Sequence, residues 1–225
     1  MSAPSFQWPL VSRYAFLVAL AQLIPVPILD VMVENWIRRR LTHIQLAAWG
    51  IELPGKDVRM LGDSSAGGCL GLVWSVIVWP IKKLLRTVLF VLQLNAMVNV
   101  FSDVVHRALL VHEALEHGLI PGDAVQVRAA MNRALKDIDT RVVERGLASV
   151  FKQSRVGLLK LFLGERGRIR EEVRAERGDV EVSDVDRAPL HDKAEAMTQA
   201  LAAAAEVPGV QAELLRRFRK EAEAL

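Results

Sequence analysis

Residues 80–118 read PIKKLLRTVLFVLQLNAMVNVFSDVVHRALLVHEALEHG, and this stretch decides the fold. Pro80 suits the first turn of a helix, where its missing amide proton is not needed, and Gly118 suits the end of one. Neither Pro nor Gly lies between them, so the stretch predicts one long helix. Alternating strand patterns bounded by Asn-Gly or Asp-Gly turns do not occur in the sequence. We therefore expect an all-α protein, a helical bundle.

The sequence before this helix predicts two further helices in an apolar N-terminal portion. The first runs from Pro9 to Leu23 and is stopped by Pro25 and Pro27, which lack an amide donor and push the preceding residue out of the helical region. The second, Ile28–Gly50, has one apolar side and one polar side, as in an amphipathic helix. We expect a loop through residues 53–56 after it.

The C-terminal portion is much richer in charge. Residues 1–120 carry ten of the 29 basic and eight of the 26 acidic residues, so most of the charge lies in the last 105. Residues 121–178 predict amphipathic bundle helices, the first with Asp123 as its N-cap. Residues 179–225 predict a loop followed by a helical hairpin, and residues 1–120 form a separate apolar, membrane-associated region.

Composition excludes several classes of function. The net charge of +3 is too small to indicate a nucleic-acid partner. Cys69 is the only cysteine, which excludes a disulfide-built secreted domain. The mean hydropathy of +0.23, with 52% hydrophobic residues, is high for a soluble protein. The sequence leaves the oligomeric state open.

Three stretches without charge suggest contact with a lipid bilayer: Tyr14–Leu29, Ser64–Ile81 and Thr87–Ser102. Each is shorter than the roughly 20 apolar residues of a straight span, which favours a shallow or re-entrant hairpin. All five tryptophans lie in the first 79 residues, and several adjoin basic groups, the pattern that anchors a protein at the headgroups. The expected membrane-interface residues are Trp8, Trp36, Arg38, Arg39, Arg40, Trp49, Trp74, Trp79, Lys82, Lys83 and Arg86.

The positive-inside tendency would place two basic clusters, Arg38 to Arg40 and Lys82 to Arg86, on the cytoplasmic side of the cytoplasmic membrane. An alternative explains the hydropathy equally well: a soluble bundle whose central helix is buried on every side.

One polar strip on the long helix is a candidate metal or ligand site. Asp103, His106, Glu113 and His117 recur at intervals that place them on one helical face. The sequence around His112 and His117 has the wrong spacing for either zinc-protease motif, and one helix seldom supplies a whole site. We therefore favour a strip that faces solvent or the next helix, and we expect neither a metal nor another cofactor.

The segment IPVPILD, residues 24–30, is followed by Arg38-Arg39-Arg40, and WPIKKLLR occupies residues 79–86. These segments resemble an uncharacterised family of bacterial helical proteins. The resemblance covers about the first half of the chain and implies no activity. The sequence thus predicts a membrane-associated, non-catalytic protein whose charged C-terminal helices contact other proteins. Its two competitors are an enzyme that uses the polar strip and a soluble all-α interaction module.

Overall fold

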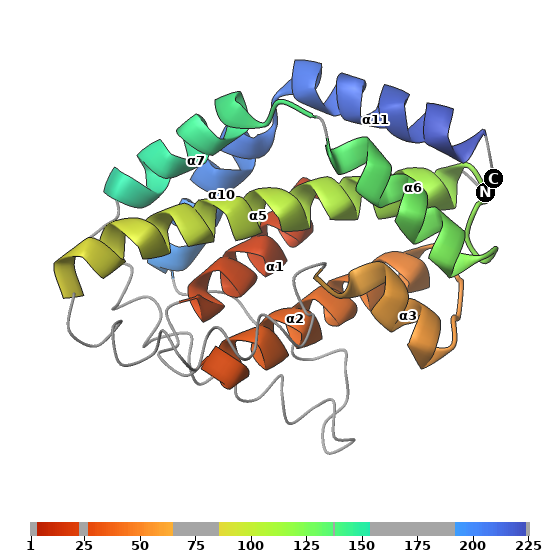
Figure 1. Cartoon of the computed structure of the whole chain (residues 1–225), viewed down its shortest axis with the longest axis horizontal. Helices are drawn as coiled ribbons and strands as arrows, with labels where there is room; N and C mark the ends of the chain where they lie inside the picture. Colours follow the sequence, from red (N-terminus) through yellow and green to blue (C-terminus); the bar gives the residue numbers. More distant parts are fainter. Residues whose placement is uncertain (1–3, 23–26, 65–85, 137, 154–191, 224–225) are drawn as a thin grey trace.

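The computed structural model describes residues 4–22, 27–64, 86–136, 138–153 and 192–223, and these residues form helices and no strand (Figure 1). The all-α prediction is confirmed. The helices are α1 (Trp8–Ala21), α2 (Pro27–Ala48), α3 (Gly55–Gly62), α5 (Arg86–Glu116), α6 (Ala124–Lys136), α7 (Arg141–Gln153), α10 (Asp192–Ala205) and α11 (Pro208–Ala222).

Helix α1 lies inside the bundle. Ten of its 14 residues are buried, and it packs against α5, α2 and α10. Pro9 occupies its first turn, where a proline does not interrupt the helical hydrogen bonds. A helix that is apolar on nearly every side must be covered on every side, and its three neighbours provide that cover.

Helix α5 runs along the whole bundle (Figure 1). Residues 80–85, with which we expected it to begin, lie outside the described residues. Its end agrees with the prediction, because Gly118 adopts a φ of +66° just beyond the last turn. The amide of Leu119 donates to the carbonyl of Ala114 at 2.9 Å, which closes the helix in a Schellman arrangement.

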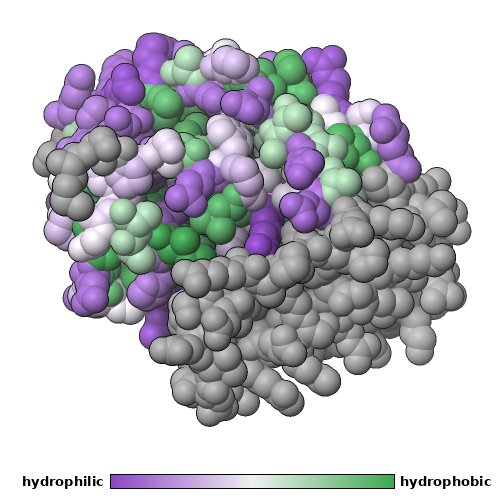
Figure 2. Space-filling view, turned by 180° about the vertical axis from the view of Figure 1, so that it is seen from behind, coloured by the Kyte–Doolittle hydropathy of each residue, from purple (hydrophilic) through white to green (hydrophobic). Residues whose placement is uncertain are grey.

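Within the described residues, one helical segment, Gln93–Glu116, is long and apolar enough to cross a membrane. In this structure 67% of the apolar window of this segment is buried. A buried core helix of a soluble protein meets the same criteria of length and composition. Figure 2 shows the face opposite to that of Figure 1, where hydrophobic residues gather in separate groups between hydrophilic ones. On that face the described residues form no continuous apolar band.

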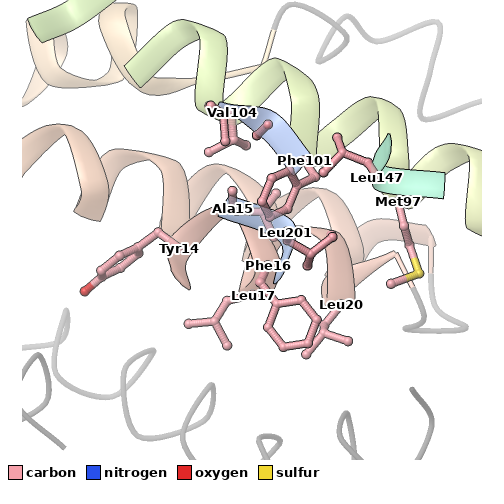
Figure 3. Packing of buried hydrophobic residues seen from close by; sticks show 14 of the residues in the cluster. Tyr14, Ala15, Phe16, Leu17, Leu20, Met97, Phe101, Val104, Leu147 and Leu201 are labelled. Atoms are coloured by element: carbon pink, nitrogen blue, oxygen red, sulfur yellow. The ribbon is translucent and has the colours of Figure 1, made fainter. Parts of the chain in front are cut away.

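Two hydrophobic clusters share α5. The first joins it to α1, α7 and α10, and includes Phe16, Phe101 and Leu201 (Figure 3). The second surrounds the C-terminal half of α5 and includes Met131 of α6 and Phe218 of α11. The helices of all three regions expected from the sequence therefore contribute to common cores.

The C-terminal helices follow the sequence pattern locally. The side chain of Asp123 accepts the amide of Val125 at 2.9 Å, which confirms it as the N-cap of α6. The expected helical hairpin is wrong, because α10 packs on α7 and α1 whereas α11 packs on α6 and α5. Each helix buries its apolar side in a different cluster, so α11 continues away from α10 (Figure 1).

Helix α3 replaces part of the expected loop. The carbonyl of Pro54 accepts the amides of Asp57 at 2.8 Å and Val58 at 3.2 Å, which starts the helix. Val58 and Leu61 are buried in the second cluster. With only eight residues, the helix is too short to show a clear periodicity in the sequence.

Candidate functional site

Arg38 of α2 lies at the centre of a group of buried charges. Its side chain is 4% exposed, and its Nε donates to Oε1 of Glu34, one turn earlier in the same helix, at 3.0 Å. Its Nη1 donates to Oδ2 of Asp103 in α5 at 2.7 Å. The second carboxylate oxygen of Glu34, Oε2, accepts a hydrogen bond from the side-chain Nε2 of Gln22 at 3.0 Å. Arg38 therefore joins α2 to α5 through two charge-assisted contacts.

Asp103 extends this group toward α6. Its Oδ1 accepts Nε of Arg107, one turn later in α5, at 2.8 Å. Nη1 of Arg107 then donates to the side-chain carbonyl of Asn132 in α6 at 3.0 Å. The carboxylate of Asp103 thus binds two guanidinium groups, and through them α5 is connected to α2 and to α6.

Arg128 of α6 and Arg39 of α2 fix the C-terminal end of α3. Arg128 donates to the carbonyl of Leu61 at 2.8 Å and to that of Asp63. Arg39 makes a bidentate pair with the side chain of Asp63, at 2.5 and 2.8 Å. The last carbonyls of a helix lack partners within it, so these arginines satisfy groups that would otherwise be unpaired. We call the whole set the charge network; it consists of Glu34, Arg38, Arg39, Asp63, Asp103, Arg107 and Arg128.

The charge network shifts the ionisation of its members. Burial raises the pKa of Glu34, and the attraction of Arg38 offsets only part of that effect. Burial acts in the same direction on Asp103, but Arg38 and Arg107 outweigh it and hold the pKa of that carboxyl below its usual value. Burial, together with the nearby Arg107, lowers the pKa of Arg128 to about 10. Arg128 therefore remains a cation at neutral pH.

The space beside the network is small. A cavity of about 20 Å³ is lined by residues that include Arg38, Thr42, Gln45 and Arg107. A single water needs about 10–15 Å³ of such volume, so the cavity suits a solvent molecule rather than a substrate. The arrangement can hold helices in place and bind or release a proton at Glu34.

The polar strip of α5 is divided among three sets of contacts. Asp103 belongs to the charge network. His106 is buried, with Nδ1 at 3.2 Å from the hydroxyl of Ser102, and its Nε2 has no partner among the described residues. Glu113 accepts Nε2 of His117 at 2.9 Å and also binds Arg219 of α11. No three His, Cys, Asp or Glu side chains of the described residues converge on a point where they could hold a metal ion.

Several residues expected at a membrane interface face the interior of the bundle. Trp36 is 8% exposed in the first cluster, and Arg38 is buried in the charge network. Arg39, which pairs with Asp63, is half-buried. Trp8 and Trp49 are half-buried. Arg40 is also half-buried, and the side chain of Arg86, at the start of α5, is not described. The expected interface residues outside the described residues are Trp74, Trp79, Lys82 and Lys83.

Two further aromatic contacts involve the half-buried tryptophans. The ring centroid of Trp8 lies 4.9 Å from that of Phe6, in an edge-to-face arrangement. That of Trp49 lies 5.8 Å from the imidazole of His112. The indoles of Trp8 and Trp49 thus pack against the protein's own rings.

A larger groove of about 630 Å³ lies beside the packed helices α1 and α10. Its apolar lining includes Trp8 and Leu10, and its charged lining includes Arg13, Glu195 and Glu206. Because basic and acidic residues are mixed in this lining, the groove does not indicate a particular class of ligand.

Sequence reasoning missed the partners that complete the charge network. The spacing of four between Glu34 and Arg38, and between Asp103 and Arg107, is a signal that could have identified the two helical pairs. Nothing in the sequence links Asp63 to Arg39 across the intervening turn and helix. Compared with protein-family models, with curated proteins and with solved structures, the chain matches none.

Proposed function

We propose that this protein is a non-catalytic helical scaffold that is attached to a membrane and presents its C-terminal helices to other proteins. The observation that carries the non-catalytic part is the charge network, in which Arg38 and Arg107 are paired with Glu34 and Asp103 beside a cavity for about one water. A bundle of this kind acts through its surface. A metal-dependent enzyme has less support, because the strip residues of α5 belong to separate contacts.

The membrane attachment is assigned to the uncharged stretch Ser64–Ile81. This stretch contains Trp74 and Trp79 and is followed by Lys82 and Lys83, the combination that favours the headgroup layer. Apart from Ser64, the stretch lies outside the described residues. The apolar residues of α1 and the C-terminal half of α5 are already used in the two hydrophobic clusters, so these helices have little apolar surface left for lipid. The basic residues at the end of the stretch would face the cytoplasm.

Cell fractionation tests the attachment. We expect the full chain in the membrane pellet after a high-salt wash. The double substitution Val76→Glu and Val78→Glu introduces two charges into the uncharged stretch and should move the chain to the supernatant. The matched control is Val125→Glu with Val142→Glu, at valines of α6 and α7 that are 57% and 50% exposed, which should stay in the pellet.

Circular dichroism of all three proteins should give the same helical content, which excludes unfolding as the cause of a change in partition. Recovery of the unmodified chain in the supernatant without detergent would support the second candidate, a soluble interaction module. One observation favours that candidate, namely the 67% burial of the apolar window in α5.

A further inference from the structure

Positive charge is concentrated on the pair of helices α6 and α11, which pack against each other. α6 carries three basic residues and no acidic one, and α11 carries four basic and two acidic residues. Their surplus of five positive charges exceeds the net charge of +3 of the whole chain. The rest of the protein is therefore negative overall, and the pair stands out electrostatically.

The outer side of α11 forms a shallow depression of about 550 Å³ that we call the basic face. Its cations are Arg216, Arg219 and Lys220, at spacings of three and four from Arg216, and Leu215 contributes apolar surface between them. Glu223 at one end is the acidic residue of the lining, so the cations outnumber it by three to one. The side chain of Arg216 is 67% exposed and that of Arg219 is 55% exposed. Lys220 is also exposed and makes no ion pair with a described residue.

The two arginines of the basic face are held in position by carboxylates beneath or beside them. Arg216 makes two contacts of 2.8 Å with Glu213, one turn earlier. Arg219 binds Glu113 of α5, whose side chain is 4% exposed. Hydrogen bonds from Arg216 and Arg217 lower the pKa of Glu213 to about 2, so this carboxylate stays ionised at every physiological pH. The guanidinium groups are thus spread along the helix instead of converging on one point.

This distribution favours an extended anion over a compact one. A phosphate group is bound where several free N–H donors point at the same place, and here both arginines of the basic face already bind a carboxylate. An extended acidic chain can instead follow the row of cations and place apolar side chains on Leu215. Among extended anions, the apolar floor favours an amphipathic protein segment, because a nucleic-acid backbone has no aliphatic side chains to place there.

The position of the basic face separates it from the proposed membrane attachment. α11 lies along the upper right of Figure 1, whereas Arg86, just beyond the uncharged stretch, begins α5 at the left end. A chain attached to a bilayer near Arg86 would leave α11 free for another partner.

We propose that the basic face of α11 binds an acidic, amphipathic segment of another protein. The proposal rests on the protein-contact part of the proposed function and is independent of the membrane attachment. α6 contributes to the attraction through Arg133 and Lys136, both exposed. Arg133 pairs with Glu221 of α11 and so keeps the two helices together.

Fluorescence anisotropy of a labelled probe tests this proposal on the purified full chain in detergent micelles. The probe is a helical peptide built from Glu and Leu, and the control probe has Gln in place of every Glu. We expect binding of the acidic peptide only, weakening as salt is added, because exposed charges are screened. Substitution of Arg216→Glu with Lys220→Glu should weaken binding by about tenfold or more, since it places like charges opposite the peptide.

The matched control is Lys56→Glu with Arg59→Glu on α3, which reverses two exposed charges on a different helix and should change the affinity by less than about twofold. Arg216→Ala with Lys220→Ala, checked by circular dichroism, keeps the test valid if the reversed charges disturb folding. Equal affinity of the native chain and the α11 variants would overturn the proposal.

Two other probes test the class of partner. Stronger binding of a single-stranded oligonucleotide, or of vesicles containing phosphatidylserine, lost on the same α11 substitutions, would also overturn it. Failure of the fractionation experiment with retained peptide binding would remove the membrane attachment alone.

Discussion

Nη1 of Arg38 lies 2.7 Å from Oδ2 of Asp103, although the two residues are 65 positions apart in the chain. This contact joins the N-terminal part of the bundle to α5, and the same guanidinium also neutralises Glu34, whose side chain is 10% exposed. The stability of the fold should therefore depend on Arg38 more than on any surface arginine.

Replacement of Arg38 should destabilise the protein strongly. Arg38→Met leaves Glu34 buried without its cation, and removing one partner of a buried pair lowers the free energy of unfolding by about 3–5 kcal/mol. Urea denaturation followed by circular dichroism measures the change. Glu34→Gln combined with Arg38→Met should recover part of the loss. Arg141→Met, at a side chain 84% exposed, should stay within about 0.5 kcal/mol of the native value.

The buried imidazole of His106 should make the protein less stable in mild acid. Burial lowers its pKa from the ordinary 6.5, and a hydrogen bond with the backbone of Ser102 and the charges of Asp103 and Glu144 offset only part of this effect. As the pH falls below 6.5, the unfolded chain therefore takes up a proton that the folded protein does not. The contribution of His106 is complete above that pH and is lost progressively below it.

His106→Gln should accordingly reduce the slope of the free energy of unfolding between about pH 7 and about pH 5. The measurement is urea denaturation at a series of pH values. The matched control, His43→Gln on the exposed side of α2, should leave the slope unchanged. Identical slopes for the native chain and His106→Gln would contradict the prediction.

Gly118 should tolerate no side chain without loss of stability. Its φ of +66° is a left-handed conformation, which costs about 1–2 kcal/mol for a residue with a Cβ atom. We expect Gly118→Ala to lower the melting temperature. Gly209→Ala is the control, because Gly209 lies in the first turn of α11 with no heavy atom within 4 Å of an added Cβ atom. A melting temperature equal to that of the native chain would show that the helix end can rearrange.

The packing of α7 on α10 should also be sensitive to the size of the side chain at position 146. A Cβ atom at Gly146 would lie 3.3 Å from the carbonyl oxygen of Ala204. Gly146→Val adds two more carbon atoms there, and overpacking of this kind typically costs about 1–3 kcal/mol. Thermal unfolding would measure the loss. Combination with Ala204→Gly, which removes a neighbouring methyl group, should restore some of it.

The sequence was sufficient to predict the fold class and most helices, because proline and glycine mark their ends. Pro9, Gly118 and Asp123 act as expected through local backbone chemistry. α3 was missed because eight residues span barely two turns. The separation of α10 from α11 depends on which cluster each apolar side joins, and the sequence around Pro208 carries no information about that choice.

The candidate site was less predictable for a related reason. The spacing of Asp103, His106, Glu113 and His117 placed them on α5, but each side chain's partner comes from a different part of the chain. Arg38 looked like one of three equivalent surface arginines, and only the packing of α2 on α5 turns it inward. Local pattern predicts the helix; pairing between helices requires the tertiary structure.

The two hydrophobic clusters have α5 in common, and this limits how the gene can be divided for expression. A fragment that stops at residue 120 would lack α7 and α10, which cover α1 and α5. A fragment that begins there would lack the helix on which α6 and α11 rest. Either truncation would expose hydrophobic side chains and promote aggregation. A shortened protein for crystallisation should therefore keep both terminal helices, α1 and α11.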